Sequence, residues 1–427
     1  FVKNIIFRKI AKINNFFIFH FNKINEFIKI INHKFKNISS FNRYLIFLII
    51  ILFLYLFFLS IPSLYDKGVI QTKLNKIIEQ EYNINISLSS DIKYNILPKP
   101  HFLIKNAKIF TNNPDAPIEV GQIKKLRAYI DQRNFFKKNK IGLVSISIND
   151  ANFSIHQKDM EYLKEYLETK LSKKKLSISN SKFFYIDENE EVISIFPISK
   201  VTMYYDDIDS KNTFISKGEF FSTPYTLNWN KDFNNQLNST FLRLNELNIR
   251  MENFTDKKAS NLSMKNYIFF RSAEIETDIL IEEKSIKLKS SGNSKIKNNK
   301  LNYTGEIFLN PFQITTEVNL GKLDFRKSIF DNDLLRRIFE IKHLYNQNLS
   351  LILNLRIEKL VKNKLFKSSN VLVNLSSGNI NFNNSIFSGD VGNLNLINSN
   401  ILNFKDDLIF NGNFRFNIIS KNEFYRL

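Results

Sequence analysis

The residues best able to do chemistry are scattered along the chain. None of the five histidines stands at the H-E-x-x-H spacing of a metal-binding helix. The sequence has no cysteine, which excludes disulfides, thiolate metal sites and a cysteine nucleophile. It also lacks the glycine-rich motifs that bind phosphate and the G-x-S-x-G motif of serine hydrolases. We therefore expect all five histidines to be surface or interface residues: His20, His33, His101, His156 and His343.

Acidic residues form two clusters, DENEE at residues 187–191 and the pair Asp206 and Asp207. A glycosidase or a metal site needs carboxylates that converge in a cleft. DENEE instead lies between two strand-like runs, where a hairpin turn is expected. We interpret this cluster as a turn, and we predict that the protein is not an enzyme and binds no metal or cofactor.

The chain is basic, with 61 Lys and Arg against 41 Asp and Glu and a formal net charge of +20. A nucleic-acid interface would gather this charge on one face or mix it with stacking aromatic residues. Here lysines recur along the whole chain between Asn and Ser. The pattern favours a solvated basic surface and predicts no nucleic-acid partner.

The clearest predicted element is a transmembrane helix at residues 44–61, an uncharged run that reads YLIFLIIILFLYLFFLSI. At 1.5 Å per residue it spans roughly 27 Å, close to the thickness of the hydrocarbon core of a bilayer. The long segment before it and the sequence SIPSLYD after it do not fit a cleaved signal peptide. We expect an uncleaved anchor.

Residues 1–43 contain nine Lys and Arg against one acidic residue, Glu26. This excess predicts a cytoplasmic N-terminus, which in a bacterium puts the rest of the chain in the periplasm. The segment has two interpretations: a disordered tail, or an amphipathic helix on the anionic inner leaflet. The helical interpretation depends on apolar residues at helical spacing: Phe17, Phe21, Ile24, Phe27, Ile31 and Phe35.

Beyond the anchor the sequence predicts a mainly β protein. Residues 65–81 have the spacing of a short amphipathic helix, and from Asn83 onward the chain reads as short runs of alternating polar and apolar residues. Two further helices are expected, at residues 159–171 and 333–344. Because neighbouring runs are joined by short loops, a meander of antiparallel strands is the simplest topology.

The alternation places apolar residues on one face of each strand. If the sheet forms an apolar groove, the candidate lining residues are those in the cleanest runs: Val144, Ile146, Ile148, Ile307, Leu309, Leu349, Leu351, Leu353, Leu355, Ile357, Val371, Val373, Leu375, Leu408, Phe410, Phe414, Phe416 and Ile418. Alternation does not separate such a groove from a closed sandwich or barrel, in which these faces pack against each other as a solid core, and on the residues alone we favour the sandwich or barrel.

The order of these elements resembles the AsmA family of bacterial envelope proteins. After the anchor, SLYDKGVIQTKLNKIIEQEYNINISL resembles the family's exit helix and first strand, and DIKYNILPKPHFLIKNAKIF resembles its proline-marked strand pair. NFFKKNKIGLVSISINDANFSIHQKD is similar to the segment that follows. Near the other end, NLSLILNLRIEKL, NVLVNLSSGNINF, SGDVGNLNL and DDLIFNGNFRF resemble the family's C-terminal region, with Gly378, Gly389, Gly392 and Gly412 at turns or bulges.

The resemblance implies an inner-membrane protein whose long, curled β-sheet forms a hydrophobic groove for phospholipids moving towards the outer membrane. It implies an α+β region at residues 62–172 and the groove region at residues 173–427. The alternative is a scaffold that binds an outer-membrane or assembly-machinery partner by strand addition at a sheet edge. Residues 1–43 have no counterpart in the family, and the ends at Phe1 and Leu427 suggest a fragment.

Overall fold

The fold comes from a computed structural model. The structure describes five positions between residues 22 and 29 and then residues 39–110, 118–137, 141–156, 165–186, 192–220, 223–246, 248–256, 263–270, 273–282, 284–291, 300–309, 312–324, 350–404 and 407–426. The chain divides into two compact units. The first holds residues 1–65 and 132–140, and the second holds the rest.

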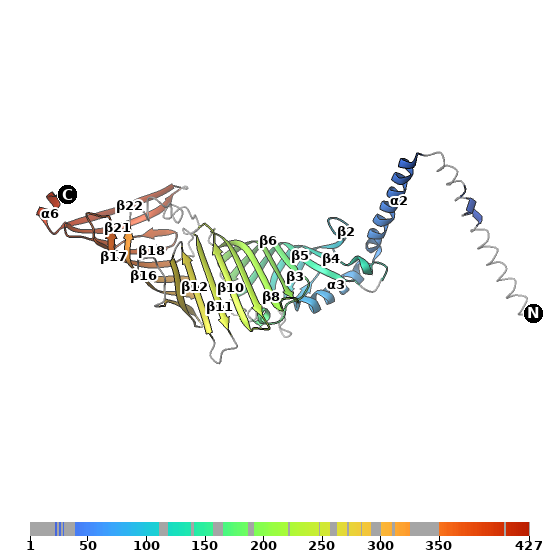
Figure 1. The fold of residues 1–427 in the computed structure, drawn as a ribbon, viewed down its shortest axis with the longest axis horizontal. Coiled ribbons are helices and arrows are strands. Elements are labelled where there is room, and N and C mark those ends of the chain that lie inside the picture. Colours follow the sequence, from blue (N-terminus) through green and yellow to red (C-terminus); the bar gives the residue numbers. More distant parts are fainter. Residues whose placement is uncertain are drawn as a thin grey trace, which may run out of the picture. The chain divides into compact units, whose positions relative to one another are not determined.

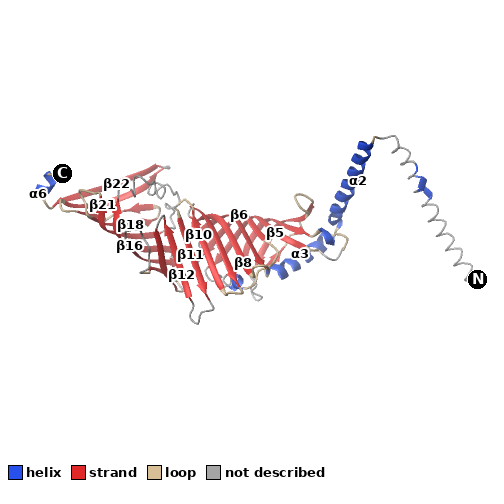
Figure 2. Ribbon diagram, in the orientation of Figure 1, coloured by secondary structure: helices blue, strands red, loops and turns tan. Residues whose placement is uncertain are grey.

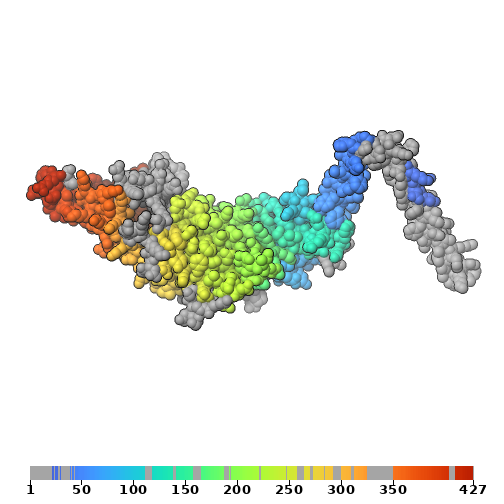
Figure 3. Space-filling model, in the orientation of Figure 1, coloured from blue at the N-terminus to red at the C-terminus, as the bar shows by residue number. Residues whose placement is uncertain are grey.

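The first unit contains the apolar helix α2 (Ser40–Ser60), which continues into the 3-10 turn η1 (Ile61–Leu64). The Ser39 side chain caps its start by accepting from the backbone N–H of Asn42. The stretch Tyr44–Leu64 is long and apolar enough to cross a membrane, and 6% of its most apolar window is buried. Figure 3 draws this stretch in blue. The expected apolar helix is confirmed. A second piece of this unit carries the short 3-10 turn η2 (Gln132–Asn134).

The second unit opens with helix α3 (Lys67–Tyr82), which confirms the helix expected after the anchor. Asp66 caps its first turn by accepting from the backbone N–H of Val69. The helix ends at Asn83, which adopts the left-handed conformation of a helix C-cap at φ 51°. Strands follow for almost all of the remaining described chain (Figure 1), up to the short helix α6 (Lys421–Tyr425).

All the strands of the described residues belong to one 22-stranded sheet. Figure 2 draws these strands in red. The expected mainly β fold is therefore confirmed. The strands are β1 (Asn85–Ser87), β2 (Ile92–Asn95), β3 (His101–Phe110), β4 (Glu119–Ile130), β5 (Leu143–His156), β6 (Leu176–Ile186), β7 (Val192–Asp206), β8 (Lys211–Phe220), β9 (Thr223–Asp232), β10 (Leu237–Leu244), β11 (Ile249–Asp256), β12 (Ser263–Phe270), β13 (Ala273–Ile281), β14 (Ser285–Ser290), β15 (Leu301–Leu309), β16 (Phe312–Asp324), β17 (Ser350–Val361), β18 (Ser368–Ser376), β19 (Asn379–Asn381), β20 (Ile386–Ser388), β21 (Gly392–Phe404) and β22 (Asp407–Ile418).

The strands pair almost in chain order, from β3 beside β4 to β21 beside β22. The expectation of an antiparallel meander is wrong at two joins, because β5 pairs with β6 and β16 pairs with β17 in parallel. A parallel pair needs a crossover connection, usually a helix. Both expected interior helices lie on these connections. Residues 165–168 of the first are helical, and the second lies outside the described residues.

At one level of the sheet, a residue in the left-handed conformation interrupts the regular alternation of several of the first strands. Asn106 in β3, Asp150 in β5 and Asn180 in β6 all have positive φ, between 48° and 56°. Each of these residues acts as one extra residue in its strand and shifts the in–out alternation of the side chains by one position. In β5, Ile148 and Ala151 therefore both point to the buried side although they are three residues apart. Asn and Asp tolerate this left-handed conformation better than other residues that have a Cβ.

Glycines expected at turns occupy such positions near the other end. Gly378, with φ 75°, lies in the turn between β18 and β19, and the backbone N–H of Gly389 donates to the Gly392 carbonyl at 3.0 Å. Gly412 lies opposite the irregularity of β21, where a Cβ would come within 2.5 Å of the Ser399 hydroxyl.

Some expectations fall outside the described residues. These are the turn at residues 187–191, which follows β6 and precedes β7, and most of residues 1–43. The boundary expected at residue 172 lies between β5 and β6, which pair with each other.

Candidate functional site

One face of the sheet carries a nearly unbroken line of apolar side chains. Residues directly opposite each other on neighbouring strands point to the same face. The line starts at Ile92, and each of its residues is the cross-strand partner of the next one. Ser216 is the one polar residue in it. We call this the N-terminal row, and it runs through β2 to β13: Ile92, Ile104, Leu126, Ile148, Ile178, Val201, Ser216, Leu227, Leu242, Met251, Ile268 and Ile275.

A second line begins on the same face of β13 and continues to β22. We call it the C-terminal row: Ile281, Ile286, Ile307, Ile314, Leu351, Leu375, Ile380, Ile401 and Phe410. Leu375 and Ile380 are buried at its centre, with Phe312, Val373 and Phe382 packed around them. Together the rows define an apolar face. With strands about 4.8 Å apart, they extend roughly 50 Å and 40 Å along the sheet.

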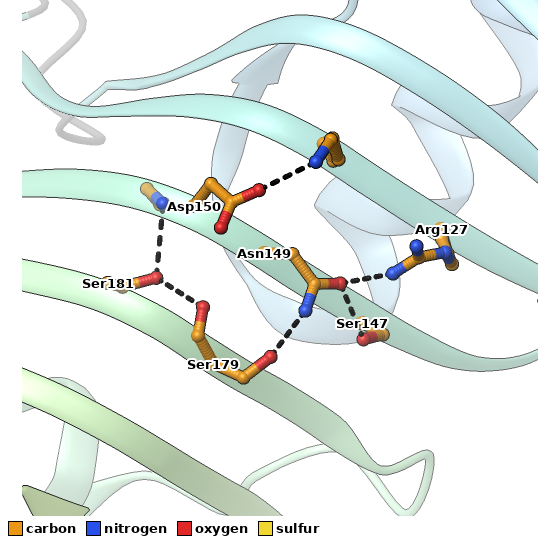
Figure 4. A network of polar contacts seen from close by, with 8 residues as sticks. Arg127, Ser147, Asn149, Asp150, Ser179 and Ser181 are labelled. Atoms are coloured by element: carbon orange, nitrogen blue, oxygen red, sulfur yellow. Dashed lines mark hydrogen bonds and ion pairs between the residues drawn. The ribbon is translucent and has the colours of Figure 1, made fainter.

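The opposite face is polar where β4, β5 and β6 meet (Figure 4). Asn149 accepts a hydrogen bond from Arg127 and donates one to Ser179, and Lys125 forms an ion pair with Asp150 at 2.9 Å. The hydrogen bond from Lys125 holds the pKa of the Asp150 carboxyl below its usual range. At these three strands the sheet thus has one polar face and one apolar face.

The first strands bury their apolar face. Phe102, Ile104 and Leu126 are at most 1% exposed. Helix α3 buries Ile70, Leu74, Ile78 and Tyr82, which recur every four residues and form one side of the helix. The Gln71 amide donates to the Leu88 carbonyl at 2.5 Å, which ties α3 to the segment after β1. This end of the apolar face is a packed core.

Beyond this core the apolar face contains a cavity of about 290 Å³. Its lining comes from β3 to β8 and from the segment after β5, and it includes Ile148, Phe153, Phe183, Val201, Met203 and Phe214. Tyr166 and Leu167 also line it. Asn212 of β8 anchors residues 169–171, which come directly after this part of the lining. Its side-chain N–H donates to the Thr169 carbonyl at 2.6 Å, and its side-chain oxygen accepts from the Leu171 N–H at 2.9 Å.

Polar side chains interrupt the apolar face in the middle of the sheet. Asn253 donates to Asn266, and Asn266 donates to the Thr277 carbonyl at 3.2 Å. The Thr277 hydroxyl bonds the Tyr303 hydroxyl, and the Tyr303 N–H donates to Ser290 at 2.9 Å. We call these five residues the polar ladder. It passes between the two rows on β13, where Thr277 lies between Ile275 and Ile281.

Members of the polar ladder are largely removed from solvent. Asn266 is 4% exposed and Thr277 is 2% exposed. Burial raises the pKa of the Tyr303 phenol above its usual range. Because the ladder residues bond one another, their polar groups are satisfied without a bound ligand. Lys231, on the same face, is paired with Glu168 at 2.6 Å.

Most of the predicted lining residues share the apolar face. Ile146, Ile148, Ile357 and Leu375 are buried, and the remaining ones whose side chains are described are half-buried or exposed. The strand parity puts on this face Ile307, Leu351, Leu353, Leu355, Val371, Val373, Leu375, Phe410, Phe414, Phe416 and Ile418. The side chains of Leu309 and Leu408 lie outside the described part of the structure. Leu349 lies outside the described residues.

Val144 is the exception. The register between β4 and β5 shifts there, so that Leu143 pairs with Ile130 and Ser145 pairs with Tyr129. Leu143 takes the inward position at 4% exposure, and Val144 is 51% exposed. The prediction that Val144 points inward is wrong because a bulge changes the phase of the strand.

Sequence reasoning missed two parts of this face. Strands β9 to β12 supply Leu227, Leu242, Met251 and Ile268 to the N-terminal row, but polar residues at the neighbouring inward positions hide their alternation. The polar ladder itself leaves no pattern that sequence alone distinguishes from surface Asn and Thr. His101 is 3% exposed, and its Nδ1 lies 2.7 Å from the Lys99 carbonyl oxygen, so it is an interior residue and the expectation of a surface position is wrong.

No known protein family and no curated protein matches the chain in sequence. Among solved structures, the chain is similar to the "Crystal structure of Sex pheromone staph-cAM373 precursor", at 8% identity over 75% of this chain and 93% of that one. The TM-score is 0.12, so this similarity supports no conclusion about fold or function. Within the described residues, no group of three or more His, Asp or Glu side chains is close enough together to hold a metal ion.

Proposed function

We propose that this protein is an AsmA-like envelope protein that carries phospholipid acyl chains along its apolar face. In this proposal α2 anchors the chain in the inner membrane and the sheet lies in the periplasm, where it conducts lipid between the inner and outer membranes. The observation that carries the proposal is the continuity of the two apolar rows, which together place an apolar side chain on almost every strand from β2 to β22.

The energetics of lipid movement fit such a face. Each CH₂ group exposed to water costs about 0.8 kcal/mol, so a sixteen-carbon chain costs on the order of 12 kcal/mol to expose. Apolar contact along the rows would remove much of this cost at every step. Headgroups could stay in water, so this function requires no catalytic group, metal or cofactor. The cavity lined by Phe153, Phe183 and Met203 has the apolar lining that an acyl chain needs.

Photo-crosslinking in membranes tests the proposal. A benzoyl-phenylalanine probe is placed on the apolar face at Leu242, Leu353 or Phe416, and on the opposite face at the adjacent Arg243, Asn354 or Arg415. Mass spectrometry then identifies the adducts. We expect lipid adducts at the first three positions and none at their neighbours. Adducts only within the chain at the apolar positions would contradict the proposal and indicate a packed core.

The second candidate is a scaffold that binds a protein partner by strand addition. Strand β22 favours it, because β22 pairs only with β21 in the described part of the chain and exposes Phe414 at 73%. The same experiment separates the two functions. A scaffold would give protein adducts at Phe416 and Arg415 alike and no lipid at Leu242.

A further inference from the structure

The segment that joins β4 to β5 belongs with the apolar helix. Residues 132–140 form one compact unit with residues 1–65. The Phe58 ring of α2 lies 5.4 Å from the Phe135 ring and 5.2 Å from the Phe136 ring, measured between ring centroids. The Tyr65 hydroxyl donates to the Phe135 carbonyl, which fixes the segment to the end of the helix at a second point.

These contacts determine how deep the segment lies if α2 spans a bilayer. Phe58 precedes Leu64, the last residue of the candidate span, by six residues. At 1.5 Å per residue this is about 9 Å of helix. A ring that touches Phe58 therefore lies below the end of the span, at the level where acyl chains meet headgroups.

The two aromatic rings play different parts. Phe135 is 3% exposed, so it packs within the protein. Phe136 is 79% exposed and Leu64 is 82% exposed, so both apolar side chains are free to contact lipid. Arg133 and Lys137 are exposed on either side of the pair and carry the charge that anionic headgroups attract.

We propose that residues 132–137 are an interfacial membrane anchor, in which Phe136 inserts among lipids of the bilayer that holds α2. The segment thus gives the β4–β5 connection a fixed depth in the membrane. The inference requires α2 to lie in a bilayer, and it does not require the sheet to carry lipid.

Depth-dependent tryptophan quenching tests this anchor. Trp229 is the one tryptophan of the chain, so W229F gives a background free of tryptophan. In this background F136W is the test variant. Ile208, 93% exposed in the turn after β7, gives the aqueous control I208W, and Phe53 inside α2 gives the membrane control F53W. The full chain is reconstituted in vesicles of phosphatidylcholine and phosphatidylglycerol, with and without bromine on the acyl chains.

We expect brominated lipid to lower the emission of F136W and F53W at least twofold and to leave that of I208W unchanged. F136W should also emit at shorter wavelength than I208W. If F53W is quenched while F136W behaves like I208W, the anchor proposal is overturned although α2 lies in the membrane. If neither F136W nor F53W is quenched, the premise that α2 lies in a bilayer fails and the anchor fails with it.

Discussion

At the scale of single residues, the left-handed positions of the first strands decide which side chains reach the apolar face. Asn180 of β6 has φ 48° and an exposed side chain. A residue other than Gly, Asn or Asp at such a position costs roughly 1–2 kcal/mol. If Asn180 did not add this extra residue to β6, the side chains after Ile178 that now point to the apolar face would point to the opposite face.

We therefore expect Asn180→Val to lower the free energy of unfolding by about 1–2 kcal/mol, whereas Asn180→Gly should leave it within about 0.5 kcal/mol. Denaturant unfolding of the purified protein in detergent measures the difference. The control is Lys182→Ala, an exposed position of the same strand with no positive φ. Equal losses for the Val and Gly variants would show that the backbone conformation is not the cause.

The polar ladder makes a second prediction for single residues. Asn266 is buried and bonds both Asn253 and the Thr277 carbonyl. Asn266→Leu removes both hydrogen bonds, so that the Asn253 amide N–H loses its acceptor, and should destabilise the protein by about 1–3 kcal/mol although it adds apolar surface to the face. The exposed neighbour Lys265→Ala serves as the control. A stabilised Leu variant in the same unfolding assay would contradict the structural importance of the ladder.

At the scale of elements, the N-terminal row passes from strand to strand through single side chains. Leu242 of β10 lies between Leu227 and Met251, and its neighbour Arg243 points to the opposite face. A charge in this row would interrupt apolar contact over two strand spacings, and a buried carboxylate costs several kcal/mol.

We expect Leu242→Glu to lower lipid crosslinking several-fold at one of two benzoyl-phenylalanine probes, at Ile178 or at Leu353, and to leave the other unchanged. The affected probe would lie beyond the block, so the result would also reveal from which end lipid enters. Arg243→Glu, on the opposite face, should affect neither probe. Unchanged yields at both probes in Leu242→Glu would mean that lipid does not pass along this row.

The sequence predicted which face each side chain lies on only where the strand alternates regularly. The alternation of Leu351 to Ile357 is unbroken, so sequence alone placed these residues on one face. In β5 the bulge at Val144 and the left-handed Asp150 each shift the phase, and a fixed period of two cannot follow such shifts. The parallel joins were also missed, because strand patterns do not record direction, although the two expected helices lie on those connections.

At the scale of the whole molecule, one helix within the described residues is long and apolar enough to cross a membrane. The candidate span Tyr44–Leu64 has no charged residue in it and a mean hydropathy of 3.0 in its most apolar window. A charged residue at the centre of such a helix costs about 2.5–3.5 kcal/mol on insertion scales. Two such residues would offset much of the tendency to insert.

The double variant Ile50→Arg with Phe53→Arg should therefore move most of the protein from the membrane pellet to the supernatant after alkaline carbonate extraction. The unsubstituted protein should stay in the pellet. The control variant Asn42→Arg, which changes a residue of α2 outside the candidate span, should also stay there. Retention of the double variant would mean that another part of the chain holds it to the membrane, and the aromatic segment at residues 132–137 would be the first to examine.

The order of strand pairing also bears on how the protein folds during its synthesis. Because most strands pair with the strand made just before them, each addition closes only a short loop and can occur while the chain is still emerging. The two parallel joins differ, since β6 and β17 must wait for the crossovers at residues 157–175 and 325–349 to be completed. Folding of the nascent chain should pause at these two points, with the unpaired backbone edges of β5 and β16 exposed until the next strand arrives.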